Sequence, residues 1–115
     1  MKIVFYQNHA GEAVVLDWIH EQKDKVQAKI FRDLKLLEQY GLSFGEPDIE
    51  LIDKKDRIWE IKTRFGGNIY RIFFTIHEDA ILLHGFHKKT QKTPANEVET
   101  AVKRLKQYLE NKKER

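Results

Sequence analysis

Cysteine is absent from the 115 residues, which excludes disulfides and thiolate zinc sites and makes a reducing compartment the natural expectation. Apolar runs are also short. None is long enough to cross a bilayer, and the run at the N-terminus is too short for a secretory signal peptide. Internal repeats, low-complexity stretches and linkers are absent as well. We therefore expect a single cytoplasmic domain over residues 1–115, with no membrane partner.

Charge of either sign is nearly balanced overall, with a net charge of +3, but it is unevenly distributed along the chain. Residues 1–56 carry 8 Lys and Arg against 11 Asp and Glu, whereas residues 57–115 carry 13 against 7. This asymmetry makes a polyanion such as nucleic acid a plausible partner for the second half of the chain. An ordinary solvated charged surface is the alternative interpretation.

Hydrophobic periodicity predicts an α+β fold. The predicted elements are a strand over residues 3–6, helices over 10–20 and 24–40, strands over 57–65, 69–76 and 80–87, and a last helix beginning near Thr93-Pro94. Residues 42–56, with a glycine, a proline and several carboxylates, are predicted to be mostly loop. The order β-α-α-β-β-β-α predicts a mostly antiparallel sheet with the helices packed on one face.

Strand parity then predicts a register for the sheet. A two-residue turn at Gly66-Gly67 sets Lys62 opposite Arg71 and Trp59 opposite Phe74, and a four-residue loop gives the same pairing. A three-residue loop would mix the apolar and polar faces instead. If Glu78-Asp79 forms the next turn, the pairs are Phe74 with Leu83, Phe73 with His84, and Arg71 with Phe86.

This register gathers cations, aromatic rings and a histidine on the face that the helices leave uncovered. The residues on that face are Lys62, Arg64, Arg71, Phe73, His84, Phe86 and Lys88. Like charges directly opposed in a hairpin, such as Lys62 and Arg71, are unfavourable. We therefore expect an anion to neutralise them when the protein is at work.

Such a face has the groups needed to cleave RNA, a reaction that requires neither metal nor cofactor. The 2′-hydroxyl can attack the adjacent phosphate while Arg64 and Arg71 stabilise the added negative charge. His84 is the candidate general acid or base, and Phe73 and Phe86 could stack on splayed bases. A hydrogen-bonded structural role is the alternative for His84. His84 and His87 point to opposite faces of a strand, so we expect no metal site.

Residues 59–64 (WEIKTR), the following glycine pair and residues 70–74 (YRIFF) resemble the central hairpin of the RelE/ParE toxin superfamily. Residues 82–94 (LLHGFHKKTQKTP) are similar to the phage-derived, HigB-like branch. The resemblance covers nearly the whole chain. It implies a RelE-like fold and a toxin of a type II toxin–antitoxin system, which enters the ribosomal A site and cuts mRNA during translation. It also implies a HigA-like helix-turn-helix antitoxin. The toxin would then contact operator DNA only through this antitoxin.

The resemblance also assigns residues. It places the family's catalytic and phosphate-binding basic residues at Lys62, Arg64, Arg71 and the Lys88-Lys89 pair. The residue analysis adds His84 to the catalytic residues, and it adds Lys92, Phe73 and Phe86 to Lys89 as RNA-binding residues. Two departures stand out. RelE has a lysine where this chain has Glu60, and its base-stacking tyrosine has no counterpart between Lys88 and Pro94. His84 or Lys92 is therefore the candidate for proton transfer, and Phe73 or Phe86 for stacking. A plain solvated charge run is the alternative for Lys88, Lys89 and Lys92.

Two other functions suit the same sequence. A ParE-like inhibitor of DNA gyrase would bind a protein and need no ribonuclease site. A non-catalytic nucleic-acid-binding module would bind with strong salt dependence and release no cleavage products.

Overall fold

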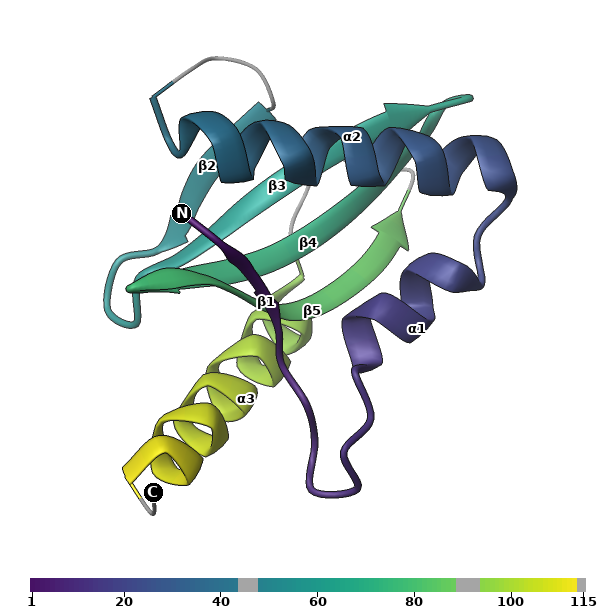
Figure 1. Cartoon of the computed structure of the whole chain (residues 1–115). Coiled ribbons are helices and arrows are strands. Elements are labelled where there is room, and N and C mark those ends of the chain that lie inside the picture. The colour runs from purple at the N-terminus through teal and green to yellow at the C-terminus, as the bar shows by residue number, and fades with distance from the viewer. Residues whose placement is uncertain (44–47, 89–93, 114–115) are drawn as a thin grey trace.

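A computed structural model of the chain describes residues 1–43, 48–88 and 94–113. In these residues five strands form one sheet: β1 (Ile3–Phe5), β2 (Asp48–Asp53), β3 (Ile58–Phe65), β4 (Asn68–His77) and β5 (Asp79–Lys88). Three helices accompany them: α1 (Val14–His20), α2 (Asp24–Tyr40) and α3 (Ala95–Lys113). The strand order is β1-β5-β4-β3-β2, antiparallel throughout except for the parallel pair of β1 and β5 (Figure 1). The predicted α+β class is confirmed.

Helix α2 has the bounds that its apolar spacing predicts. Val26, Ile30, Leu34 and Leu37 recur every three or four residues and are all buried against the sheet. Burial of each such side chain stabilises the fold by roughly 1.5–3 kcal/mol. Gly41 caps the helix after Tyr40, with a positive φ of 65° that few other residues tolerate and an N–H that donates to the Leu37 carbonyl at 2.8 Å.

The predicted β3–β4 hairpin is confirmed. Gly66 and Gly67 both have positive φ, 56° and 80°, and the register pairs Lys62 with Arg71 and Trp59 with Phe74. Two residues of turn are therefore sufficient to align the apolar side chains of both strands on the face beneath α2.

The register of β4 with β5 is as predicted at one end and shifted at the other. Phe73 lies opposite His84, but Phe74 pairs with Leu82 rather than Leu83 because the register shifts between Phe73 and Phe74. A β-bulge of this kind leaves an extra residue on one strand, here Leu83 on β5. The shift lets Leu83 enter the core beneath α3.

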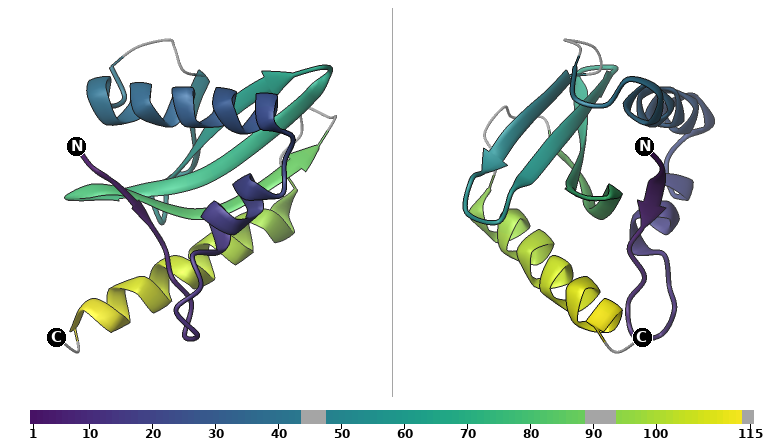
Figure 2. Two further views of the ribbon diagram at one scale, coloured as in Figure 1. Left: turned by 45° about the vertical axis from the view of Figure 1, so that its right-hand side comes forward. Right: turned by 60° about the vertical axis from the view of Figure 1, so that its left-hand side comes forward.

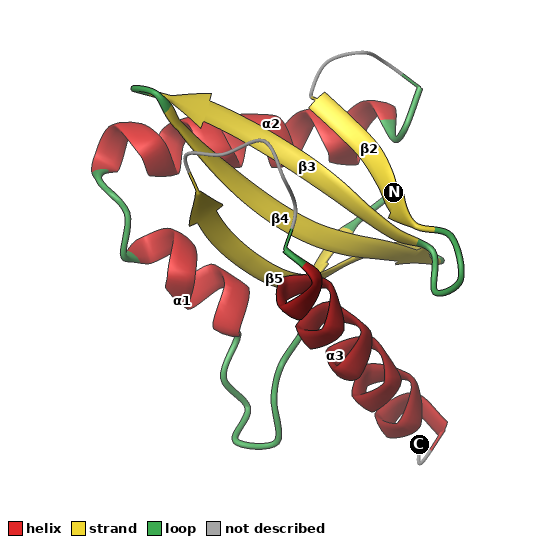
Figure 3. Cartoon of the chain, turned by 180° about the vertical axis from the view of Figure 1, so that it is seen from behind, coloured by secondary structure: helices red, strands yellow, loops and turns green. Residues whose placement is uncertain are grey.

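The helices cover both faces of the sheet, which corrects the prediction of a single covered face. Helices α1 and α2 pack over one face, whereas α3 packs over the other, as Figures 2 and 3 show. The second core packs Ala101 and Leu105 of α3 against residues that share the other face of the sheet: Tyr6, Ile58, Phe73, Ile81, Leu83 and Phe86. The amphipathic stripe of α3 requires an apolar partner, and this face of the sheet supplies it.

Two further boundaries differ from the sequence predictions. Residues 48–53, predicted as loop, form the edge strand β2, which pairs with β3. Helix α1 begins at Val14 rather than near Ala10, because the preceding loop is closed by the Asn8 side chain, whose Oδ1 accepts the N–H groups of Ala10 and Glu12. None of the helices in the described part of the chain is both long and apolar enough to cross a membrane.

Candidate functional site

The three predicted cations Lys62, Arg64 and Arg71 lie on the same face of the sheet. Lys62 is directly opposite Arg71, and Arg64 follows two residues later on β3. This face is opposite the one that α1 and α2 cover. The three side chains differ in solvent exposure: Arg71 is fully buried, Lys62 is 11% exposed and Arg64 is 50% exposed.

Glu60 neutralises the opposed cations from within the fold. Its Oε2 lies 2.9 Å from the guanidinium of Arg71, and its Oε1 lies 3.6 Å from Nζ of Lys62. The glutamate is as deeply buried as Arg71. The opposed charges therefore have an internal counter-ion in place of the external anion that the sequence led us to expect. A buried charge of either sign is costly unless paired, so Glu60 and Arg71 hold each other in position.

The edge strand β2 adds two more carboxylates to this face. Glu50 Oε2 lies 3.3 Å from Nζ of Lys62, and Asp48 Oδ2 lies 3.0 Å from the guanidinium of Arg64. We call the six residues Asp48, Glu50, Glu60, Lys62, Arg64 and Arg71 the charged cluster. It contains three acids and three bases, so its formal charge is zero. The surface that the sequence predicts as cationic is thus balanced by β2 and by Glu60.

The two predicted base-stacking residues lie in the core beneath α3. Phe73 is fully buried and Phe86 nearly so, and their rings meet edge to face with centroids 5.1 Å apart. They pack with Leu83, Ala101 and Leu105. In this arrangement neither ring has a face accessible to a nucleotide base, so their role here is packing.

His84 is held between the sheet and α3 by both ring nitrogens. Nδ1 lies 3.2 Å from the guanidinium of Arg104, and Nε2 lies 3.2 Å from Oε1 of Glu97. A guanidinium can only donate, so Nδ1 accepts and carries no proton, while Nε2–H donates to Glu97. The imidazole is therefore neutral here. Burial lowers the pKa of His84, and the charge of Arg104 lowers it further, against the opposing effect of Glu97.

Arg104 extends this contact toward β1. Its guanidinium also donates to the Leu83 carbonyl at 2.9 Å and lies over the ring of Tyr6. The hydroxyl of Tyr6 donates to the Gln107 side chain, and burial raises the pKa of that hydroxyl. His84 thus belongs to a polar network that fixes α3 on the sheet, which is the structural alternative that its sequence position left open.

The network predicts a pH dependence of stability. Because the pKa of His84 is lowered in the fold, the unfolded chain binds this proton more readily than the folded protein does. The stabilising contribution is therefore present above the unfolded pKa of about 6.5 and is lost as the pH falls below it. We expect the melting temperature to fall between about pH 7.5 and about pH 5.5, and to fall less steeply in His84→Gln. The exposed His77→Gln serves as the control, and parallel curves for all three proteins would refute the assignment.

The remaining predicted residues are at or beyond the end of β5. Lys88 is the last residue of β5 and pairs with Ile69, but its side chain lies outside what the structure describes. Lys89 and Lys92 also lie outside the described residues. In the part of the chain that is described, no three His, Asp or Glu side chains converge in a way that could hold a metal ion.

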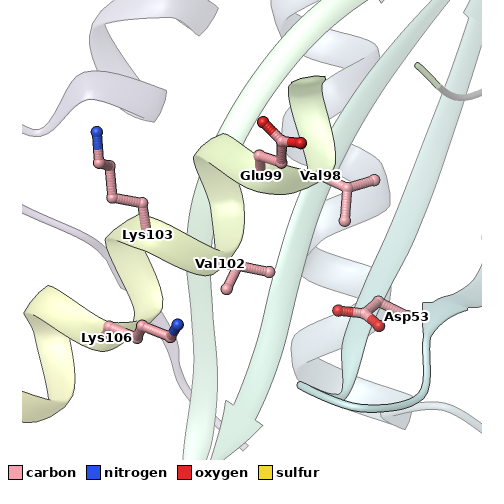
Figure 4. A pocket seen from close by; sticks show the side chains of 6 residues that line it. All are labelled: Asp53, Val98, Glu99, Val102, Lys103 and Lys106. Carbon is pink, nitrogen blue, oxygen red and sulfur yellow. The ribbon is translucent and has the colours of Figure 1, made fainter. Parts of the chain in front are cut away.

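A shallow groove lies between α3 and the end of β2 (Figure 4). It is lined by Asp53, Val98, Glu99, Val102, Lys103 and Lys106. Both signs of charge surround two valines, so the groove does not form a cationic track. Glu50 is the member of the charged cluster nearest to Asp53 along β2, and at the rise of an extended strand the two residues are about 10 Å apart.

A mostly antiparallel five-stranded sheet with three helices is compatible with the RelE-like toxin fold. The model of one family, described as "Phage derived protein Gp49-like (DUF891)", matches residues 17–106. The chain therefore belongs to the Gp49-like family, a family of toxins of the toxin–antitoxin type, whose partner is a cognate antitoxin. No curated protein gives a match to this sequence.

Proposed function

We propose that this toxin is a ribosome-dependent mRNA endonuclease of the HigB-like branch. The observation that carries the proposal is the placement of Lys62 and Arg64 side by side on one face of β3, where both side chains retain some exposure to solvent. Association of the Gp49-like family with toxin nucleases supports it. The ribosomal A site would present the mRNA, and a HigA-like helix-turn-helix antitoxin would block the toxin and contact operator DNA.

The proposed reaction needs no cofactor. The 2′-hydroxyl gives its proton to a base and attacks the adjacent phosphorus. The bond to the 5′-oxygen of the next nucleotide breaks and that oxygen takes up a proton, so the products are a cyclic phosphate and a free 5′-hydroxyl. Lys62 and Arg64 would stabilise the negative charge that develops on the phosphoryl oxygens. Arg71 is a positioning residue in this scheme, because it is buried and holds Glu60, which in turn contacts Lys62.

Of the two candidates for proton transfer that the sequence offers, His84 and Lys92, His84 is restrained by its contacts. Both ring nitrogens of His84 are engaged by Glu97 and Arg104, so His84 could act only after α3 releases it. Lys92 is the other candidate. Its ammonium group would suit the donation of a proton to the leaving 5′-oxygen.

The class of reaction can be tested by mapping transcript ends after induced expression of the toxin. We expect new 5′-hydroxyl ends within minutes, confined to translated regions and placed in frame with the codons. A transcript whose start codon is removed provides the control, because it is synthesised but not translated. Cuts of equal frequency in that transcript would contradict ribosome dependence.

The balanced charge of the cluster also suits one alternative function, inhibition of DNA gyrase, and the same experiment tests it. A ParE-like gyrase inhibitor binds a protein and needs no cationic track for RNA. It would leave transcripts intact while producing signs of DNA damage. Intact transcripts in growth-arrested cells would therefore overturn the nuclease proposal.

A further inference from the structure

We propose that Asp48 and Glu50 of the edge strand β2 restrict RNA binding by occupying the two cations that the phosphates of an RNA strand would contact. The inference rests on the proposed function, and it adds two specificity-determining residues from β2, a segment whose composition predicts a loop. Its basis is the pair of outer ion contacts in the charged cluster.

The register of β2 on β3 brings these carboxylates to the cations. Asp48 pairs with Lys62 across the ladder, and Glu50 pairs with Glu60. Residues that pair across a sheet share a face, so both β2 carboxylates lie on the face of Lys62 and Arg64. Glu50 faces a like charge in Glu60, and Lys62 relieves this repulsion by lying within 3.6 Å of both carboxylates.

The cluster has an inner part that is fixed and an outer part that can exchange. The inner pair of Glu60 and Arg71 is buried, and to separate it would leave an uncompensated charge in the core. The outer carboxylates are open to solvent: Asp48 is 46% exposed beside Arg64 at 50%, and Glu50 is 62% exposed beside Lys62 at 11%. Exposed ion pairs of this kind are weak and yield to competing ions. A phosphate can therefore replace either carboxylate without disturbing the core.

The arrangement suits a strand with successive phosphates. Lys62 and Arg64 are two residues apart on one face of β3, which places their Cα atoms about 6.6 Å apart along the strand. Each cation could then contact a neighbouring phosphate of one RNA strand. While Asp48 and Glu50 remain in place, the cluster carries no net charge and attracts free RNA only weakly. An RNA strand already held in position loses less freedom on binding and can displace the carboxylates more readily.

The test compares RNA binding by the whole chain with and without the two outer carboxylates. Binding of a labelled single-stranded oligoribonucleotide would be measured without ribosomes over a range of salt concentrations, for the wild type and for Asp48→Asn/Glu50→Gln. We expect the double variant to bind about five- to twentyfold more tightly, since each exposed pair contributes a factor of up to about five. The slope of log K against log salt should steepen by about 1.4, or about 0.7 for each phosphate newly contacted.

A control variant separates this local effect from the change in net charge. Glu21→Gln/Glu110→Gln removes two exposed carboxylates, one after α1 and one in α3, and so raises the net charge by the same amount. We expect its affinity to stay within about twofold of the wild type, with an unchanged salt slope. The single variants Asp48→Asn and Glu50→Gln should each give an intermediate affinity, which keeps the test valid if the double variant folds poorly.

The outcomes distinguish this inference from the function on which it rests. If the charge-matched control binds RNA as tightly as Asp48→Asn/Glu50→Gln, the inference is overturned while the RNA target stands. If neither protein binds RNA and transcripts stay intact in cells, the nuclease proposal and this inference both fail. Tighter binding and a steeper salt slope confined to the β2 variants would support the inference.

Discussion

Replacement of Arg71 by alanine is expected to lower the free energy of unfolding by about 3–5 kcal/mol. The change removes the guanidinium that lies 2.9 Å from Glu60 and leaves a buried carboxylate without this partner. It also opens a cavity where one of the largest fully buried side chains among the described residues stood. Urea denaturation followed by circular dichroism would measure the loss.

A second variant shows whether the lost charge partner is the cause. Arg71→Met/Glu60→Met removes both charges and fills most of the space, and apolar replacements of buried ion pairs are often neutral in stability. We expect it to recover most of the loss. A loss below about 1 kcal/mol for Arg71→Ala would show that the pair is not structurally important. Loss of toxicity in Arg71→Ala alone would not identify a catalytic role, because the fold is weakened as well.

Lys62→Met is expected to reduce the rate of mRNA cleavage on the ribosome by about 10²–10³ while leaving the fold intact, by analogy with the loss of one oxyanion-hole donor. Lys62 is a partly exposed cation, and the buried pair of Glu60 and Arg71 remains without it. The methionine keeps most of the apolar stem of the side chain. Single-turnover cleavage by purified toxin on ribosomes programmed with mRNA would measure the rate.

Two controls accompany the Lys62 variant. Lys62→Arg keeps the charge and should retain a substantial part of the rate. Lys103→Met removes an exposed cation of α3 near the groove in Figure 4, away from the charged cluster, and should cleave as the wild type does. A rate for Lys62→Met within about threefold of the wild type would exclude Lys62 from transition-state stabilisation.

The parts of the fold that are set by local chemistry could be predicted from the sequence. The spacing of Val26, Ile30 and Leu34 together with Gly41 defines α2 at both ends. The two positive φ angles at Gly66 and Gly67 fix the hairpin register, so the opposition of Lys62 and Arg71 followed directly. Each of these features depends on residues close together in the chain.

Features that depend on distant partners were missed. Ile49 and Leu51 alternate with carboxylates, which is a strand pattern, but the surrounding glycine, proline and acids favoured a loop. The bulge at Leu83 arises because β5 must satisfy both the β4 ladder and the core beneath α3. Ile58, Ile81 and Leu83 share the face of Phe73, and this apolar group was the available sign that α3 would cover it.

In the candidate site, too, some features follow from residues close together in the chain and others depend on distant partners. The sequence places three cations on one face, and the structure brings them together. The sequence alone could not show that Asp48 and Glu50 reach Lys62 and Arg64, since that requires β2 to be recognised as a strand. Nor could it show that α3 buries Phe73 and engages His84 through Glu97 and Arg104. Side-chain chemistry follows from residue type, whereas counter-ions and burial follow from long-range packing.

The parallel pairing of β1 with β5 has a consequence for folding of the chain during its synthesis on the ribosome. Ile3 lies beside Ala80, so the first strand to emerge finds its partner only after most of the chain has been synthesised. Closure of so long a loop precedes any gain from the contact and delays completion of the sheet. A nascent chain therefore assembles its sheet late, and a copy truncated before β5 leaves its first strand without a neighbour.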